Sequence, residues 1–142
     1  MSERQIQIFP DKDALAEAAA TEIIRSFRTA MQERGYFNIA LAGGSTPRLL
    51  YERLAHAPRT IQIDWGRVNV FWSDERAVPL DHDDSNYRMA REALQHLPIP
   101  KENIHPMYGH NPDLDAAALR RNLAGCWTGR PYGVAVSAQP RA

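Results

Sequence analysis

Two glycines and two hydroxyl residues lie together in the sequence AGGSTP at residues 42–47, between an apolar run and a helical pattern. A strand that turns into a helix at this point leaves the first backbone N–H groups of the helix unpaired, at the positive end of its dipole. Glycines allow that backbone to approach an anion closely, because no Cβ intervenes. The turn therefore indicates a phosphate-binding site at residues 43–46.

A plain strand-to-helix turn is an alternative explanation of the same residues. In this interpretation a glycine supplies the turn, Thr46 caps the helix and Pro47 takes the first helical position. It does not require the complete Gly-Gly-Ser run. The motif is also neither a GxGxxG dinucleotide fingerprint nor a Walker loop, since it lacks Gly-Lys-Ser/Thr. Both interpretations remain open at this point.

A second group of polar side chains, in the sequence SDERAVP at residues 73–79, follows the next apolar strand. Arg76 can bind a phosphate through two parallel hydrogen bonds, and Asp74 can orient a sugar hydroxyl or a catalytic side chain. The alternative is a solvated loop in which the carboxylates pair with the arginine. Further along, Asn86 either lines the same cleft or simply follows a helix cap formed by Ser85.

Alternating strands and helices are needed to bring these loops together, and the hydrophobic periodicity predicts them. Strands are expected at 5–9, 36–42, 67–72 and 103–107, and helices at 10–35, 47–56, 85–97 and 113–124. This order predicts an α/β fold with a mostly parallel sheet and helices on both faces. Ligands of such sheets bind at the carboxyl ends of the strands, where loops 43–46 and 73–84 both lie.

The composition limits the classes of function that the chain can have. Its 142 residues suffice for one domain, and 17 Lys and Arg balance 17 Asp and Glu, so there is no basic surplus for a nucleic-acid partner. We expect no membrane partner and a cytoplasmic location, because no apolar run approaches membrane-spanning length and the first residues lack a signal core. One cysteine, Cys126, excludes an internal disulfide.

Other groups that could carry chemistry have simpler structural explanations. The sequence DHDD at residues 81–84 could bind a metal, but consecutive side chains seldom converge on one ion, so a loop is favoured. His105 lies in a predicted strand and is expected to be structural, and Trp65 and Trp72 are expected to pack in the core. Cys126 has no neighbour in the sequence that would make it a nucleophile.

The chain resembles the 6-phosphogluconolactonase family from about residue 5 to about residue 124. The resemblance is carried by AGGSTP at 42–47, WSDERAVP at 72–79, DSNYRMA at 84–90 and NIHP at 103–106. Each motif is weak alone, but their order and spacing together are specific. The resemblance implies a Rossmann-like α/β fold and hydrolysis of 6-phospho-D-glucono-1,5-lactone to 6-phosphogluconate, a step of the oxidative pentose phosphate pathway. It implies no metal and no organic cofactor.

The resemblance also assigns roles to residues of this chain. Asp74 would support the catalytic centre, and Arg76 would bind the phosphate. The residues implied to bind substrate are Gly43, Gly44, Ser45, Thr46, Arg76 and Asn86. The related amino-sugar-phosphate deaminases and isomerases share the Gly-Ser-Thr-Pro turn, but they tend to follow Asp-Glu with an aromatic residue. Glu75-Arg76 therefore favours the lactonase.

The sequence departs from the family toward its C-terminal end. The later family motif, with Asp-Gly-His-Thr-Ala-Ser and its presumed general-base histidine, is absent, as is a later phosphate-binding lysine. We expect an α/β domain at 1–124, incomplete at its C-terminal end, and an atypical tail at 125–142 produced by truncation or a reading-frame change. A genuine short paralogue is the alternative, and a phosphosugar-binding remnant without catalysis is a rival function.

Overall fold

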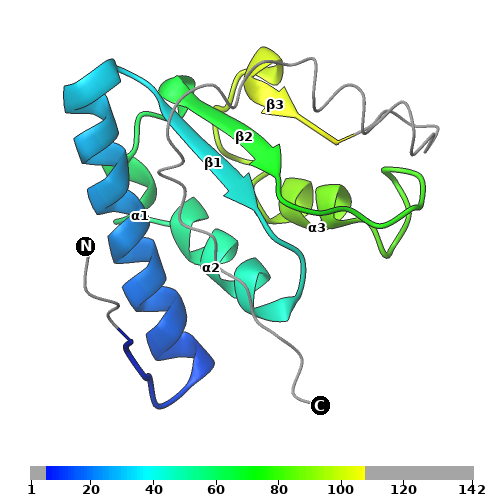
Figure 1. The fold of residues 1–142 in the computed structure, drawn as a ribbon, viewed down its shortest axis with the longest axis horizontal. Helices are drawn as coiled ribbons and strands as arrows, with labels where there is room; N and C mark the ends of the chain where they lie inside the picture. Colours follow the sequence, from blue (N-terminus) through cyan, green and yellow to red (C-terminus); the bar gives the residue numbers. More distant parts are fainter. Residues whose placement is uncertain (1–5, 108–142) are drawn as a thin grey trace.

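A computed structural model describes residues 6–107, which form an α/β fold (Figure 1). Its α-helices and strands are α1 (Lys12–Arg34), β1 (Phe37–Leu41), α2 (Ser45–Ala55), β2 (Val68–Trp72), α3 (Asn86–Ala93) and β3 (Ile104–His105). Short 3-10 helices lie at Thr60–Gln62, Trp65–Arg67 and Lys101–Asn103. The predicted alternation of strand and helix is thus confirmed from the first long helix onward. The predicted helix at 113–124 and the proposed boundary at residue 124 lie outside the described residues.

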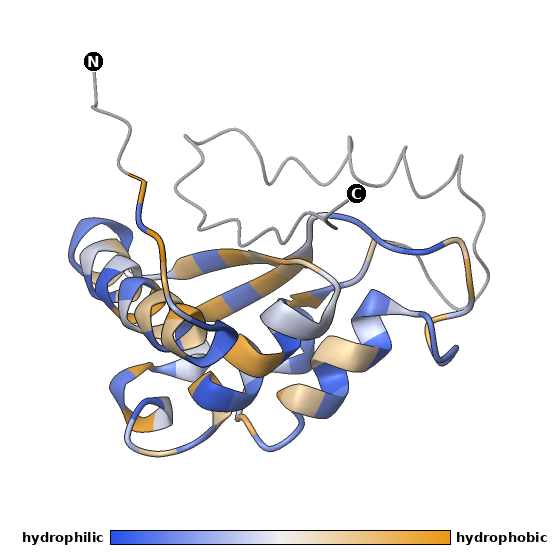
Figure 2. Ribbon diagram, turned by 90° about the horizontal axis from the view of Figure 1, so that it is seen from below, coloured by the Kyte–Doolittle hydropathy of each residue, from blue (hydrophilic) through white to orange (hydrophobic). Residues whose placement is uncertain are grey.

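The strands form a parallel sheet in the order β1-β2-β3. Leu41 pairs with Trp72 at the carboxyl ends of β1 and β2, and Val70 pairs with Ile104 further along. Figure 2 shows α2 and α3 on the same side of this sheet. Because the strands are parallel, the loops that follow β1 and β2 leave the sheet at the same edge. This confirms the predicted parallel α/β architecture.

Helix α1 begins and ends where its sequence predicts. Asp11 is the N-cap, and its carboxylate accepts a hydrogen bond of 2.7 Å from the backbone N–H of Ala14. Gly35 ends the helix in the left-handed conformation, with φ of 77°, which glycine adopts without steric cost. The capping residues therefore fix both ends of the longest described helix.

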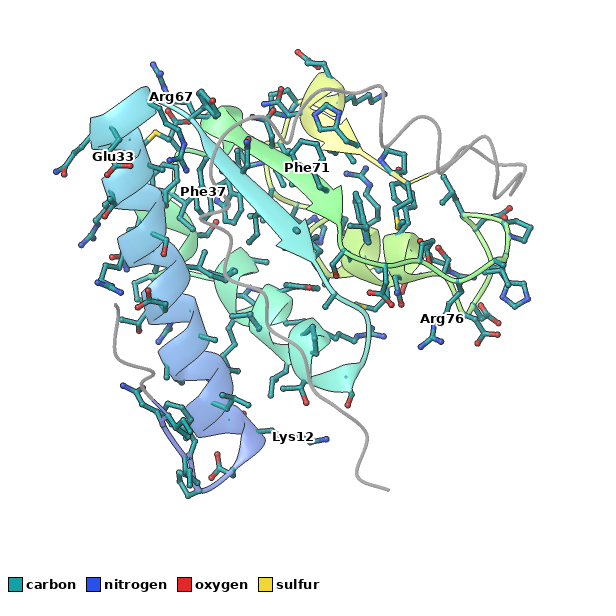
Figure 3. All side chains as sticks on the ribbon, viewed as in Figure 1. Lys12, Glu33, Phe37, Arg67, Phe71 and Arg76 are labelled. Atoms are coloured by element: carbon teal, nitrogen blue, oxygen red, sulfur yellow. The ribbon has the colours of Figure 1, made fainter. Side chains whose placement is uncertain are left out.

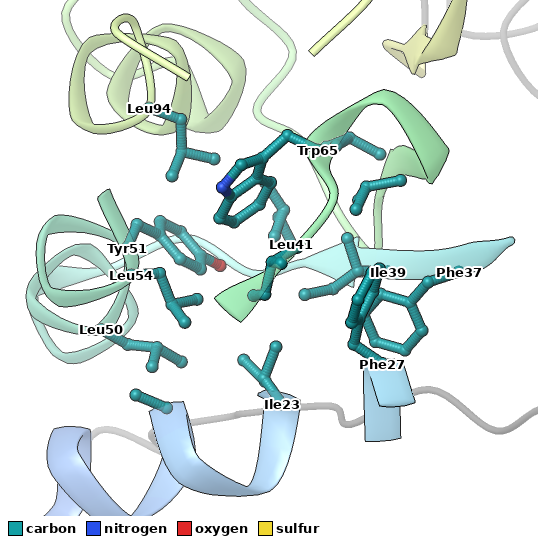
Figure 4. Packing of buried hydrophobic residues seen from close by; sticks show 14 of the residues in the cluster. Ile23, Phe27, Phe37, Ile39, Leu41, Leu50, Tyr51, Leu54, Trp65 and Leu94 are labelled. Atoms are coloured by element: carbon teal, nitrogen blue, oxygen red, sulfur yellow. The ribbon is translucent and has the colours of Figure 1, made fainter. Parts of the chain in front are cut away.

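The core lies between the helices and the buried face of the sheet (Figure 4). Residues 37, 39 and 41 of β1 are buried and alternate with half-buried positions, as expected for a strand. The rings of Phe27 on α1 and Phe37 on β1 meet edge to face, with centroids 6.0 Å apart. Trp65 and Trp72 are both buried, which confirms their predicted packing role.

Charged side chains join α1 to α2 at the side of this core. Glu17 on α1 accepts hydrogen bonds from Arg53 on α2 and from Arg59, and Arg53 also binds Asp13. These pairs involve partly exposed groups, so each adds little to stability. Their geometric effect is to hold α2 in a defined position against α1.

The strand predicted at 5–9 is wrong for its described part. Residues 6–9 form no strand, and Ile6 and Ile8 are 78% and 92% exposed. The alternation of apolar and polar residues is real, but a strand also needs a neighbouring edge with which to form hydrogen bonds. No such pairing to residues 6–9 occurs within the described part of the chain.

The helix predicted at 85–97 is shorter than expected. α3 ends at Ala93, and residues 94–97 form a turn in which the backbone N–H of Leu97 donates to the carbonyl of Leu94. Pro98 disfavours helical geometry at Leu97, so the helix could not have continued to the predicted end. Among residues 6–107, no helix is both long enough and apolar enough to cross a lipid bilayer.

Candidate functional site

The glycine turn at residues 43–46 and the second polar loop, at residues 73–84, begin at neighbouring points of the sheet. Beyond the last strand pair, the backbone N–H and the Oγ of Ser73 both bond to the carbonyl of Leu41, at 2.9 and 3.0 Å. These bonds fix the start of the second loop against the residue that precedes the turn. The two loops therefore lie side by side at the carboxyl edge, as the sequence predicts.

The start of α2 exposes backbone rather than a capping side chain. Gly44 is the N-cap, with φ of 104°, and no side chain of the described residues caps this end. Gly44 and Ser45 are exposed, so solvent or a ligand can reach the first helical amides. Because the helix dipole is positive here, the arrangement suits an anion.

The plain-turn alternative is wrong in its details. Thr46 is a helical residue and is buried, at 6% exposure, so it does not cap the helix. Pro47 occupies the third helical position rather than the first. The helix starts one residue before the predicted cap, because Gly44 can adopt a positive φ and takes the cap position itself.

Gly43 packs directly against the side chain of Asn86, the first residue of α3. A Cβ added to Gly43 would lie 2.0 Å from Asn86 Oδ1, far inside any allowed contact. Asn86 in turn donates from Nδ2 to the carbonyl of Asp74, at 3.3 Å, and lies 3.5 Å from Asp74 Oδ2. Three predicted site residues from three separate segments thus meet at one place.

The Glu75 side chain caps the N-terminus of α3. Its carboxylate accepts hydrogen bonds from the backbone N–H groups of Asn86 and Tyr87, at 2.7 and 2.8 Å, and from the Oγ of Ser85, at 3.2 Å. Ser85 is also the N-cap, since its Oγ accepts from the backbone N–H of Arg88. The capping role suggested for Ser85 is therefore confirmed. A negative side chain already fills the positive end of this helix.

The roles of Glu75 and Tyr51 were not predicted from the sequence. Tyr51 on α2 donates from its hydroxyl to the carbonyl of Ala42 and accepts from the backbone N–H of the same residue, both at 2.9 Å. The contact of Tyr51 with Ala42 and that of Glu75 with Asn86 each join separate segments of the chain, so no helical or strand spacing indicates them. The apolar face of α2 could have suggested only that Tyr51 is buried.

Arg76 follows Glu75 on the same loop. Its backbone N–H donates to Glu75 Oε1 at 2.7 Å. Figure 3 shows the Arg76 side chain pointing outward from the loop that follows β2. Its guanidinium is therefore exposed at the edge of the sheet that also holds the glycine turn.

The remaining sequence candidates have structural roles. Arg88 binds the Asp83 carboxylate at 2.5 Å and the carbonyl of Asp81 at 2.8 Å, which anchors the 81–84 loop to α3. No cluster of three or more His, Cys, Asp or Glu suited to a metal occurs between residues 6 and 107. The His105 ring stacks on Phe71 with centroids 4.6 Å apart, and burial lowers its pKa. Cys126 lies outside the described residues.

Comparisons with known proteins identify the family of this chain. The sequence profile of glucosamine-6-phosphate isomerases/6-phosphogluconolactonase matches residues 10–133. This chain belongs to that family. The 6-phosphogluconolactonase of Nostoc sp. is 40% identical over 131 residues, which cover 90% of this chain and 53% of the relative. That of Synechocystis sp. is 42% identical over 123 residues, covering 84% and 50%.

Solved structures of the family share the fold. The crystal structure of a devB protein has a TM-score of 0.73 and 34% identity, covering 83% of this chain and 48% of that protein. The 6-phosphogluconolactonase of Trypanosoma brucei has a TM-score of 0.67 and 33% identity, covering 80% and 41%. A monomeric glucosamine-6-phosphate deaminase matches with a TM-score of 0.69 at 20% identity, which shows the fold alone. The chain thus spans about half the length of the relatives it matches.

Proposed function

We propose that the carboxyl edge of β1 and β2 binds 6-phospho-D-glucono-1,5-lactone and that the chain acts in its hydrolysis to 6-phosphogluconate. The observation that carries this proposal is the uncapped start of α2 at Gly44, beside the cluster of Gly43, Asp74 and Asn86. The family supports the substrate class, because relatives about 40% identical are named 6-phosphogluconolactonase.

The phosphate would lie at the start of α2. The backbone N–H groups of Gly44, Ser45 and Thr46 can donate to its oxygens, and the exposed Ser45 hydroxyl can add a further bond. Thr46 would act through its backbone, since its side chain is buried. Arg76 would add a planar pair of donors from the next loop.

The sugar would extend toward the second loop. Asp74 presents an exposed carboxylate there, and Asn86 holds that residue through its side-chain amide. Asp74 can accept a sugar hydroxyl or orient the group that activates water. Asn86 is nearly buried, with its amide already donating to Asp74, so its part in binding would be to shape the site around Gly43.

Hydrolysis requires water to attack the lactone carbonyl while the ring oxygen leaves. A general base that removes the proton of this water contributes about 10²–10⁴ in rate. The family motif that carries the presumed base is absent from this sequence. We therefore propose that the chain binds the phosphosugar but turns the lactone over slowly.

Binding and turnover can be measured separately to test this function. Calorimetry should detect 6-phosphogluconate binding, and Arg76→Ala should raise its Kd by about 10- to 100-fold, since the phosphate loses a charge-assisted bond. Arg25→Ala on the exposed side of α1, where Arg25 pairs with Glu22, is the control and should leave Kd unchanged. If Arg76→Ala binds like the unsubstituted chain, the placement of the phosphate is wrong.

Two rival functions predict other results in the same experiment. Turnover of glucosamine 6-phosphate, and not of fresh lactone, would identify an amino-sugar-phosphate deaminase or isomerase. Binding of 6-phosphogluconate with no lactone turnover at all would identify a phosphosugar-binding remnant. The cytoplasmic location predicted from the sequence belongs to the same proposal, and cell fractionation would test it.

A further inference from the structure

The hydrogen-bonded pairing of β1 with β2 ends just before the glycine turn. The last pair of β1 is Leu41 with Trp72, and Ser73 still bonds to the carbonyl of Leu41. Ala42, the next residue, lies outside this ladder and immediately precedes Gly43. Its backbone N–H and carbonyl therefore need other partners if the start of the turn is to be fixed.

Tyr51 supplies both of these partners with one hydroxyl. The hydroxyl donates to the carbonyl of Ala42 and accepts from its N–H, each at 2.9 Å. The ring is buried, at 3% exposure, between α2 and the end of β1, and Figure 4 shows the hydroxyl pointing toward Leu41. The bond pair thus replaces the missing ladder at the residue where the chain turns.

The phenol keeps the proton that this double role requires. Burial raises the pKa of Tyr51 to about 12, against the opposing effect of its backbone bond with Ala42, and the Asp74 carboxylate raises the pKa further. At neutral pH the hydroxyl therefore both donates and accepts.

The other side of the turn is held by Asn86. Its side chain contacts Gly43 and bonds to the carbonyl of Asp74 at 3.3 Å. Residues 42 and 43 are therefore fixed from α2 on one side and from α3 on the other. These contacts define where the chain enters the helix start at Gly44.

We infer that Tyr51 is a positioning residue that sets the direction of the Gly43 and Gly44 backbone for binding a phosphosugar. This inference rests on the proposed function, because it assumes that the anion lies at this turn. A purely structural Tyr51 would stabilise the core without changing affinity. The two roles therefore differ in what they predict for a variant that keeps the ring and loses only the hydroxyl.

Tyr51→Phe provides that variant, and Ile23→Val is its control. Ile23 is buried on α1, so its loss of one methyl group weakens the core without touching the turn. At a temperature where both variants are folded, Tyr51→Phe should raise the Kd for 6-phosphogluconate by about tenfold. Ile23→Val should leave that Kd within about twofold of the unsubstituted chain. Equal Kd values for Tyr51→Phe and the unsubstituted chain would overturn the inference.

Hydrogen exchange measured by NMR tests the same inference without a ligand. In the unsubstituted chain the Ala42 amide should exchange slowly although it lies outside the ladder, and Tyr51→Phe should speed its exchange more than Ile23→Val does. Fast exchange of Ala42 in the unsubstituted chain would overturn the inference even if Tyr51→Phe fails to fold. If the unsubstituted chain does not bind 6-phosphogluconate, the proposed function fails, and exchange still decides whether Tyr51 holds the turn.

Discussion

At the level of single residues, Gly43 and Asn86 are matched in size, because the Asn86 side chain occupies the space beside Gly43. The position that a Cβ on Gly43 would occupy is already filled by Asn86, whose Oδ1 would be 2.0 Å away. Asn86 cannot easily withdraw, because it is nearly buried and bonds to Asp74. The second glycine is needed for another reason, which is the φ of 104° at Gly44.

We predict that Gly43→Ala destabilises the protein, because the added methyl group must displace Asn86. The free energy of unfolding should fall by about 1–3 kcal/mol, as measured by urea denaturation. Gly66→Ala is a matched control, since its Cβ would be 3.3 Å from Asp64 Oδ1, a contact that a shift of a few tenths of an ångström relieves. Equal stability of Gly43→Ala and the unsubstituted chain would show that Asn86 moves without cost.

At this scale the sequence predicted which loops lie together better than it predicted the contacts between them. Glycines and hydroxyls indicated an open helix start, and Ser85 indicated a cap, because both depend on neighbours in the chain. The alternative in which Thr46 caps the helix was wrong, since Gly44 takes the cap position. The bonds of Tyr51 and Glu75 could not be predicted, because they form only after separate segments come together.

The two helices that follow β1 and β2 differ in how their N-termini are satisfied. The start of α2 has Gly44 as N-cap and no capping side chain among the described residues. The start of α3 has both the Ser85 hydroxyl and the Glu75 carboxylate on its amides. Only the first is therefore available to a phosphate, and the second is part of the scaffold.

We predict that Glu75→Gln destabilises α3, because an amide nitrogen cannot accept the bonds that a carboxylate oxygen accepts. The free energy of unfolding should fall by about 1–3 kcal/mol in urea denaturation. Glu92→Gln, on the exposed face of the same helix, removes a surface pair with Arg88 and should cost about 0.5 kcal/mol or less. A cost for Glu75→Gln no larger than that of Glu92→Gln would contradict the capping role.

Elements with strong local signals were predicted closely. α1 has its predicted start near Asp11 and its predicted end at Gly35, and both long strands were found within one residue at each end. The short strand predicted at 5–9 was wrong, because alternation indicates only which residues suit a strand and not whether a partner edge exists. Local pattern therefore predicts elements well and pairing poorly.

The described part of the molecule leaves apolar surface exposed. Ile6, Ile8 and Ile61 are at least 78% exposed, and Tyr36 is 46% exposed. Within residues 6–107, β1 and β3 each have a neighbouring strand on one side only. Open strand edges and apolar side chains both favour association with other chains.

We therefore predict that the isolated chain is marginally stable and self-associates. Sedimentation velocity should show a weight-average mass that rises with protein concentration, because apolar surface is buried on association. Ile6→Ser combined with Ile8→Ser should reduce this rise, and Ile23→Val should not, since Ile23 is already buried. A dilute monomer that unfolds cooperatively well above room temperature would contradict the prediction.

The contact between Gly43 and Asn86 also has a consequence for how such chains can diverge. Position 43 cannot accept a side chain unless residue 86 becomes smaller, because a Cβ on residue 43 would occupy the space of the Asn86 side chain. Homologues with a side chain at the first position should therefore carry glycine or alanine at the second, and the two substitutions should appear together in the family's history. A homologue that keeps asparagine at the start of α3 is therefore expected to keep glycine at the first position of the turn.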